Sequence, residues 1–377
     1  MTQPLLALDI GSTKVACAVG LPHEQGPGFD MLGTSLVPYA TVAASWLSDP
    51  LMVGRAVEQA LDQAAGAGDC HRALVALNHP LLRSEAVDAM VTLADEPVTV
   101  RAQDVDRLRK AALTQALGMD REPLHVELLR ASGNGFEGVR DPRGLAATRL
   151  RGTFHVLSMP IAARRALVQA VESAGVEVDR MVPTLRAVLA ASTDETTAQG
   201  RVLVVDIGGV SAEAGLFVEG CLERSATLAW GGLTLAISIA ETLQVTMEQA
   251  IAWSLEGTAC RKREVRTAVE GHWQALREAI AVLLDGQPQP DRILVSGRGS
   301  LMDGFVEWIE RSTGIPAGLT RNPRTSRLGD VAQQVGLTPA IGLLEMGSRA
   351  AGASGPKSQR LVDRLIGRTR TILTEYF

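Results

Sequence analysis

Apolar segments that read as strands alternate along the chain with segments of helical periodicity, the pattern of layered α/β proteins. Two strand pairs share one design. Residues 5–10 are apolar apart from one aspartate and turn through small residues into a second apolar segment at 15–19. Residues 202–207 and 214–218 repeat this arrangement. Because β-branched residues resume so soon after each turn, both pairs predict a β-hairpin, and the chain contains a duplicated hairpin unit.

The segment that follows the first hairpin unit reads independently as a small α+β unit. Residues 86–93 and 124–129 are strand-like, and residues 103–117 have helical periodicity. The acidic pair Asp104 and Asp106 stands in the first turn of that helix, where negative charge is favourable.

The last twenty residues, 358–377, predict an amphipathic helix, and the Gly- and Ser-rich residues 347–357 before them predict a flexible linker. At about 100° per residue the apolar side chains fall within one arc of roughly 160°. The residues that we predict to bind a membrane are Leu361, Val362, Arg364, Leu365, Ile366, Arg368, Ile372, Leu373, Tyr376 and Phe377.

Two interpretations of this terminal helix compete, docking on its own domain or binding to a lipid surface. From Lys357 onward the side chains carry five positive and two negative charges, while the whole chain has a net charge of −5. A basic helix on an acidic body favours an anionic membrane surface, which attracts the helix and repels the body.

Composition sets the remaining bounds. The 377 residues are 46% hydrophobic and 21% charged, as expected for a soluble protein with two or more cores. No apolar run is long enough to span a bilayer, and the first residues lack a basic region and a cleavage site, so we expect a cytoplasmic protein. The four cysteines are far apart, which argues against a disulfide framework or a zinc site. An acidic balance with 3% aromatic residues argues against nucleic-acid binding.

The two hairpins carry the candidate chemistry. Asp9 and Asp206 end their strands, where a carboxylate can hold the hydration shell of Mg²⁺. Small residues in the turns let backbone N–H groups and hydroxyls approach phosphate oxygens. A single such hairpin is most often an ordinary tight turn, but two at matching positions favour a clamp for a triphosphate. The candidate phosphate residues are Gly11, Ser12, Thr13, Lys14, Gly208, Gly209 and Ser211.

These motifs resemble those of the actin-like ATPase superfamily. LALDIGSTKVACAVG and VLVVDIGGVSAEAGLF are similar to its two phosphate motifs, and ILVSGRGSLMDGF is similar to its adenosine motif. More narrowly, DIGSTKV, RLRGTFHVLSMPIAARRALVQAVESAGVEVDRMVPT, WGGLTLAISIAETLQV and TPAIGLLEMG follow in the order found in the FtsA family of bacterial cell-division proteins. A basic amphipathic helix after a flexible linker is also a feature of that family.

The resemblance implies a two-lobed actin-like ATPase fold with an inserted FtsA-type α+β subdomain and a C-terminal amphipathic helix. Its layout would be residues 1–80 plus 155–195 as the first actin-like half, 81–154 as the insert, 196–346 as the second half with a helical subdomain at about 233–284, 347–357 as the linker and 358–377 as the membrane helix. It adds Glu213, Gly231, Gly232, Gly297, Arg298 and Gly299 to the nucleotide-binding residues, with Asp9 and Asp206 serving Mg²⁺.

Several residues depart from the family pattern. Val210 stands where the family has a third glycine, and we expect its bulk to hinder the approach of backbone to phosphate. Arg298 replaces a glycine, where it blocks the adenine slot or stacks on the base. Gln249 and Ala252 replace a Glu and a Lys that contact the nucleoside in relatives. We therefore expect ATP binding with at most weak hydrolysis, and no catalytic residue is identified.

The resemblance implies a function in cell division. The protein would bind ATP and Mg²⁺, polymerise as actin does, and tether filaments of the tubulin-like protein FtsZ to anionic lipids on the inner face of the cell membrane at the division site, together with other divisome proteins. Two alternatives stay open. One is a nucleotide-indifferent actin-like scaffold of the pilus-assembly type, and the other is an ATPase or sugar-kinase-type phosphotransferase.

Overall fold

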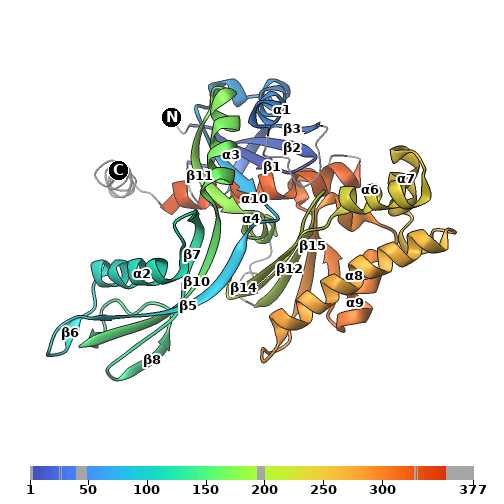
Figure 1. Cartoon of the computed structure of the whole chain (residues 1–377). Helices are drawn as coiled ribbons and strands as arrows, with labels where there is room; N and C mark the ends of the chain where they lie inside the picture. Colours follow the sequence, from blue (N-terminus) through green and yellow to red (C-terminus); the bar gives the residue numbers. More distant parts are fainter. Residues whose placement is uncertain are drawn as a thin grey trace.

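Two five-stranded sheets of the same topology form the body of the protein (Figure 1). The computed structural model describes residues 3–24, 26, 28–39, 49–192, 200–326, 328 and 330–353. The first sheet has the order β11 (Glu177–Pro183), β4 (Arg72–Leu77), β1 (Leu5–Ile10), β2 (Lys14–Pro22) and β3 (Phe29–Pro38). The second has the order β14 (Cys221–Leu228), β13 (Ala212–Val218), β12 (Arg201–Ile207), β15 (Arg292–Ser296) and β16 (Ala317–Leu319).

The two sheets match strand for strand, from β3 to β11 in the first and from β14 to β16 in the second. In each, an antiparallel hairpin is followed by a third antiparallel strand, and two parallel strands complete the other edge. The parts of the chain built around these sheets are called the first half and the second half below. Both hairpins predicted from the sequence, β1–β2 and β12–β13, are confirmed.

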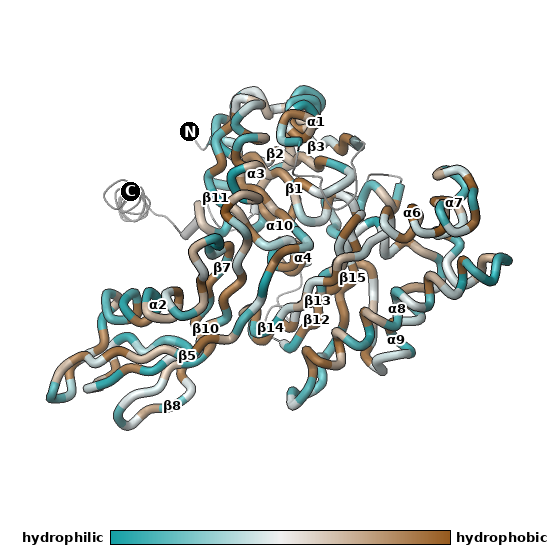
Figure 2. Tube along the Cα trace, viewed as in Figure 1, coloured by the Kyte–Doolittle hydropathy of each residue, from teal (hydrophilic) through white to brown (hydrophobic). Residues whose placement is uncertain are grey.

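Helices cover both faces of the first sheet. Leu6, Leu8 and Ile10 of β1 face α1 (Pro50–Gln63) and α3 (Ile161–Ser173) in one buried cluster. Ala7, on the opposite face, packs with α10 (Val331–Ala353) in another. This alternation follows from the two-residue period of a strand, and Figure 2 shows the apolar strands inside both sheets.

On one face of the second sheet lie α8 (Arg263–Leu284) and α9 (Phe305–Thr313), and α6 (Gly232–Leu243) and α7 (Met247–Leu255) contribute to the same buried cluster. The other face of this sheet receives the short helix α4 (Thr184–Ala191) through Leu185 and Val188. Ala187 of the same helix packs with α10 against the first sheet. Helix α4 therefore lies between the halves and belongs to both cores.

An inserted domain extends from the first half. Its sheet has the order β5 (Arg83–Thr92), β10 (Arg149–Pro160), β7 (Arg121–Gly133) and β8 (Phe136–Val139), covered by α2 (Ala102–Ala116), and β6 (Val98–Thr99) pairs with β9 (Ala146–Ala147). The strands and the helix that the sequence predicted here are confirmed. The backbone N–H of Arg101 donates to Asp104 (3.0 Å), which caps α2 through the first of the two predicted acidic residues.

The start of the predicted linker needs correction. Helix α10 continues to Ala353, so residues 347–353 are helical. Ser348 is buried, and a Cβ at Gly347 would lie 2.9 Å from Leu5 and 3.0 Å from Leu74. Small residues that suggested flexibility instead allow close packing. The predicted membrane helix, 358–377, and the rest of the linker lie outside the described residues. Within the described ranges we find no helix with the length and hydropathy of a membrane span.

Candidate functional site

A cleft of about 460 Å³ opens between the halves, at the carboxyl ends of parallel strands from both sheets. Such strand ends are where open α/β sheets bind ligands. The structure brings together at this cleft thirteen of the predicted nucleotide or metal residues: Asp9, Gly11, Ser12, Thr13, Lys14, Asp206, Gly208, Gly209, Ser211, Gly232, Gly297, Arg298 and Gly299. Glu213 and Gly231 are not among its lining residues.

The two hairpins close in the same way and face each other. In β1–β2 the N–H of Gly11 donates to the carbonyl of Lys14 (3.0 Å), and in β12–β13 the N–H of Gly208 donates to the carbonyl of Ser211 (2.9 Å). A Cβ on Gly209 would lie 2.6 Å from both Ser12 Oγ and Thr13 Cγ2. Any larger residue there would have to displace the side chains of Ser12 and Thr13, because the turns already touch. The cleft floor is thus lined by two equivalent sets of small residues.

The first hairpin carries a buried ion pair. Lys14 Nζ lies 2.6 Å from Asp9 Oδ2, and both side chains are about nine-tenths buried. The hydroxyl of Tyr39 donates to the carbonyl of Gly11 and fixes the turn from outside. An ammonium group held in this position adds positive charge where a phosphate would sit. Its pairing with the Asp9 carboxylate offsets the free energy of removing both charges from water.

The second hairpin presents carboxyls that resist ionisation. Burial raises the pKa of Asp206 to about 6, and the charge of Asp9 adds to the rise. Glu213, the cross-strand partner of Asp206, is fully buried, and burial followed by the charge of Asp206 raises its pKa well above the usual range. Thr227 donates a weak hydrogen bond of 3.4 Å to Glu213. Glu213 therefore lies buried within the hairpin and does not line the cleft.

The donor set at the cleft fits Mg²⁺. Within the described residues, no group of three or more His, Cys, Asp and Glu is arranged to hold a metal by itself. Asp9 and Asp206 both line the cleft, and Mg²⁺ usually takes one or two carboxylates together with waters and ligand phosphates. Burial, followed by the charge of Asp9, raises the pKa of Asp206, and a bound cation would favour the ionised form of this carboxyl.

Sequence reasoning missed Asn78 and Thr184, which also line the cleft. Each follows directly on the last paired residue of a parallel strand, Leu77 of β4 and Pro183 of β11, and those two residues are partners in register. Their only sequence signal was this position, a polar residue immediately after an apolar strand. Ser211 Oγ donates to Asn78 Oδ1 across the halves (3.0 Å).

Val210 does not crowd the cleft, contrary to our expectation. Its side chain is 2% exposed and belongs to the core cluster of the first half, together with residues of β1 and β2. Val210 is not among the lining residues of the cleft, so its side chain occupies the core of the neighbouring half rather than the ligand site. It thereby adds an apolar contact between the halves.

The second-half end of the cleft is apolar. Leu233, Ile251, Leu255, Leu301 and Met302 line it, with the guanidinium-bearing side chain of Arg298 at the start of a short 3-10 helix. Ser254 also lies there, but its hydroxyl donates to the carbonyl of Ile251 (2.8 Å). Gln249 and Ala252 are not among the lining residues. A flat ring with apolar faces, such as a nucleoside base, suits this end.

Known proteins with a similar sequence are cell-division proteins. A family model described as the SHS2 domain inserted in FtsA matches residues 81–158. Cell division protein FtsA of Pseudomonas aeruginosa is 24% identical over 374 residues, covering 91% of this chain and 89% of that protein.

Two solved structures show the fold. A chain of the PilM-PilN type IV pilus biogenesis complex has a TM-score of 0.69 at 15% identity, covering 93% of this chain and 99% of that chain. MreB5 of Spiroplasma citri, bound to ADP, has a TM-score of 0.54 at 10% identity, covering 94% and 99%. The resemblance seen in the sequence is confirmed: the chain is similar to FtsA over 91% of its length, its residues 81–158 match the domain inserted in FtsA, and its fold is actin-like.

Proposed function

We propose that this protein is a cell-division adaptor that binds Mg·ATP in the cleft, polymerises as actin does, and tethers FtsZ filaments to the cytoplasmic membrane through residues 358–377. The single observation that supports it most is the pair of equivalent hairpins, which face each other with Asp9 and Asp206 at one cleft. Two carboxylates, a lysine and small turn residues are suited to a metal-bound triphosphate.

The residues along the cleft suit the phosphates, the metal and the base of a nucleotide in turn. Lys14 and the turns would hold phosphates, Asp9 and Asp206 would hold the metal, and the apolar end near Ile251 and Met302 would take the base. When bound, Mg²⁺ supplies charge neutralisation for the phosphates. MreB5, a structure of the same fold, carries ADP. We assign no catalytic residue, and at most weak ATP hydrolysis is proposed.

A direct test of nucleotide binding is a titration of Mg·ATP into the full chain by calorimetry. We expect one-to-one binding that weakens about tenfold or more in Asp206→Asn, because the metal loses a charged ligand. Glu219→Gln, a carboxylate-to-amide change on the exposed β13–β14 turn, should leave the affinity unchanged. No heat of binding with the unaltered chain would contradict this part of the proposal.

The membrane part of the proposal depends on the charge asymmetry between the basic terminal segment and the acidic body. One amphipathic helix binds lipid reversibly, whereas a polymer presents many helices and gains avidity. Assembly and membrane attachment should therefore reinforce each other. The membrane-bound polymer would hold FtsZ and other division proteins at the inner face of the membrane.

A second candidate is a scaffold of the pilus-assembly type that does not respond to nucleotide. One observation favours it: the hydroxyl of Ser211, a candidate phosphate ligand, already donates its hydrogen bond to Asn78. The absence of nucleotide binding in the titration, together with membrane attachment independent of ATP, would support this scaffold. Substrate-dependent turnover of ATP would instead support a phosphotransferase.

A further inference from the structure

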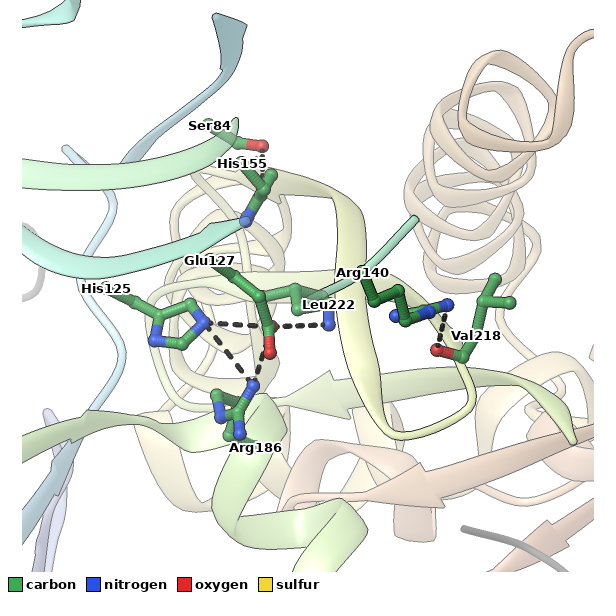
Figure 3. A network of polar contacts seen from close by, with 8 residues as sticks. All are labelled: Ser84, His125, Glu127, Arg140, His155, Arg186, Val218 and Leu222. Atoms are coloured by element: carbon green, nitrogen blue, oxygen red, sulfur yellow. Dashed lines mark hydrogen bonds and ion pairs between the residues drawn. The ribbon is translucent and has the colours of Figure 1, made fainter. Parts of the chain in front are cut away.

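Three parts of the molecule meet at one carboxylate, that of Glu127 on β7 of the inserted domain (Figure 3). Glu127 Oε2 accepts from Arg186 Nη1 of α4 at 2.8 Å and from the N–H of Leu222 on β14 at 2.9 Å. His125 Nε2 lies 3.1 Å away on the same strand. The inserted domain, the helix between the halves and the second half are thus joined through a single side chain.

The environment of Glu127 keeps it ionised. Burial by itself would raise the pKa of this carboxyl, but the hydrogen bond from His125, the charge of Arg186 and the N–H of Leu222 together lower the pKa to about 2. Its side chain is 17% exposed, so water screens these contacts only in part. The three contacts therefore act together as one charge-assisted joint.

The contacts at Glu127 lie along an edge of the second sheet that no other strand of the described residues covers. Strand β14 is an edge strand, whose outward backbone groups need partners. Besides the N–H of Leu222, the N–H of Ser225 donates to Ser84 of β5 (3.3 Å). Arg140 of the inserted domain donates to the carbonyl of Val218 (3.0 Å) at the other end of the turn. Side chains of the inserted domain thus accept hydrogen bonds from two backbone N–H groups of β14, which no neighbouring strand in the described part of the chain pairs with on this side.

Helix α4 connects this joint to the cleft. Thr184, its first residue, lines the cleft, is 3% exposed, and has no hydrogen-bond partner for Oγ1 within the described structure. No side chain in the described part of the chain caps the N-terminus of α4. A buried hydroxyl without a partner, beside uncapped N–H groups, is a ready site for an anionic oxygen. Arg186 stands two residues further along the same helix.

A shift of α4 is constrained by tight packing. A Cβ on Gly342 of α10 would lie 1.7 Å from the carbonyl oxygen of Ala187, so the two helices are in direct backbone contact. Leu185 and Val188 fill the core of the second half at the same time. Because this eight-residue helix is held on both sides, a displacement at Thr184 would be carried to Arg186.

We propose that α4 senses the ligand of the cleft through the Thr184 hydroxyl and transmits that contact, through Arg186 and Glu127, to the attachment of the inserted domain on β14. The proposal rests on the proposed function for the identity of the ligand, Mg·ATP. Thr184 contacts the ligand, and Glu127 is a positioning residue. The occupant of the cleft thereby sets how firmly the inserted domain covers the edge of the second sheet.

The test is hydrogen–deuterium exchange of the full chain with and without saturating Mg·ATP, followed in peptides that cover residues 221–228 and 121–133, with ATP affinity measured in parallel. In the unaltered chain we expect ATP to slow exchange in 221–228. Thr184→Val keeps the shape of the side chain but removes the hydroxyl, and should weaken ATP binding about tenfold and abolish the change in 221–228.

Glu127→Gln separates sensing from binding. We expect ATP affinity to stay within about threefold, less than the loss of one hydrogen bond to the ligand would cause. Exchange in 221–228 should be faster even without ligand and should no longer respond to ATP. Arg186→Lys, which weakens the same contact from the side of α4, gives the same comparison if Glu127→Gln folds poorly. Asp141→Asn, the same chemical change at an exposed pair with Arg143, is the matched control and should behave as the unaltered chain.

The outcomes separate this proposal from the function on which it rests. If the unaltered chain binds no ATP, both the nucleotide function and the sensing role are overturned. If it binds ATP but exchange in 221–228 does not respond, only the sensing role is overturned. A Glu127→Gln chain with the full ATP response, or a Thr184→Val chain with unchanged affinity and response, also overturns it.

Discussion

The hydroxyl of Ser211 donates a hydrogen bond of 3.0 Å to the side-chain oxygen of Asn78, and this bond joins the two halves at the wall of the cleft. Val210, the preceding residue, packs into the core of the first half. The second hairpin is therefore fastened to the first half by one polar and one apolar contact. A phosphate oxygen that uses the Ser211 hydroxyl must compete with Asn78 for it.

Replacing each partner of that bond should give different results. Asn78→Ala removes the acceptor, so the urea concentration at half-unfolding should fall by the equivalent of about 1 kcal/mol, while the Ser211 hydroxyl becomes free and ATP affinity is kept or rises. Ser211→Ala loses the same bond between the halves but should also weaken ATP binding about tenfold. Equal ATP affinity in the two variants would show that Ser211 serves only to join the halves.

Glycine at position 209 should be indispensable for the cleft. Gly209→Ala places a methyl group 2.6 Å from Ser12 Oγ and Thr13 Cγ2, which displaces two candidate phosphate-binding side chains, and we expect ATP binding to fall by more than about tenfold. Gly271→Ala on α8, where the same methyl group meets nothing within 4 Å, is the matched control. Calorimetric titration of both variants with Mg·ATP makes the comparison. Unchanged binding in Gly209→Ala would place the ligand elsewhere.

The effect of Mg²⁺ should depend on pH. Burial and the charge of Asp9 raise the pKa of Asp206 from 3.8 to about 6. Because the folded-state pKa is the higher one, this carboxyl favours folding while it is protonated, and that contribution is lost as pH rises through about 6. Mg²⁺ replaces the proton, so added Mg²⁺ should raise the Tm at about pH 7.5 and much less at about pH 5.

Asp206→Asn is the control for this pH dependence. The amide does not titrate, so the difference in Mg²⁺ response between the two pH values should shrink. A Mg²⁺ effect of equal size at both pH values in the unaltered chain would mean that the cation does not bind at Asp206. Thermal unfolding followed by circular dichroism is sufficient for both chains.

Arg298 should strengthen anion binding. A Cβ on Gly336 would lie 3.8 Å from Arg298 Cδ and 3.9 Å from Lys14 Cε, so both cationic side chains pass the same point of α10. We expect Arg298→Ala to weaken ATP binding about tenfold at low salt and less at high salt, because added ions screen an exposed charge. Arg277→Ala, at an exposed position of α8, is the control. Tighter ATP binding in Arg298→Ala would show that the side chain obstructs the cleft.

The hairpins could be predicted from sequence because their signals are local. An apolar strand, one aspartate near its end, and a turn of small residues occur within a short stretch, and β1–β2 and β12–β13 follow directly. The inserted domain was predicted for the same reason, since each strand and helix has its own periodicity. The matching positions of the two hairpins already indicated a shared phosphate site, and the resemblance to actin-like proteins agreed with it.

Other features depend on contacts between distant residues. Asn78 and Thr184 carry no motif, and only the register of β4 and β11 brings them to the cleft. The pair Glu127 and Arg186 lies across two domains. Gly347 and Ser348 were interpreted as linker because small residues are typical both of flexible segments and of closely packed helices, and only the position of Leu5 and Leu74 decides between these. The direction of the Val210 side chain was likewise set by the neighbouring half.

Sedimentation with anionic liposomes tests the central claim most directly. The full chain is compared with a truncation that ends at Ala353, so that α10 stays whole, each with and without Mg·ATP. The account predicts that only the full chain pellets with the liposomes and that ATP increases the pelleted fraction, because assembly multiplies the terminal helices on each particle. Equal pelleting of both chains, or of neither with or without ATP, would contradict the membrane-adaptor function.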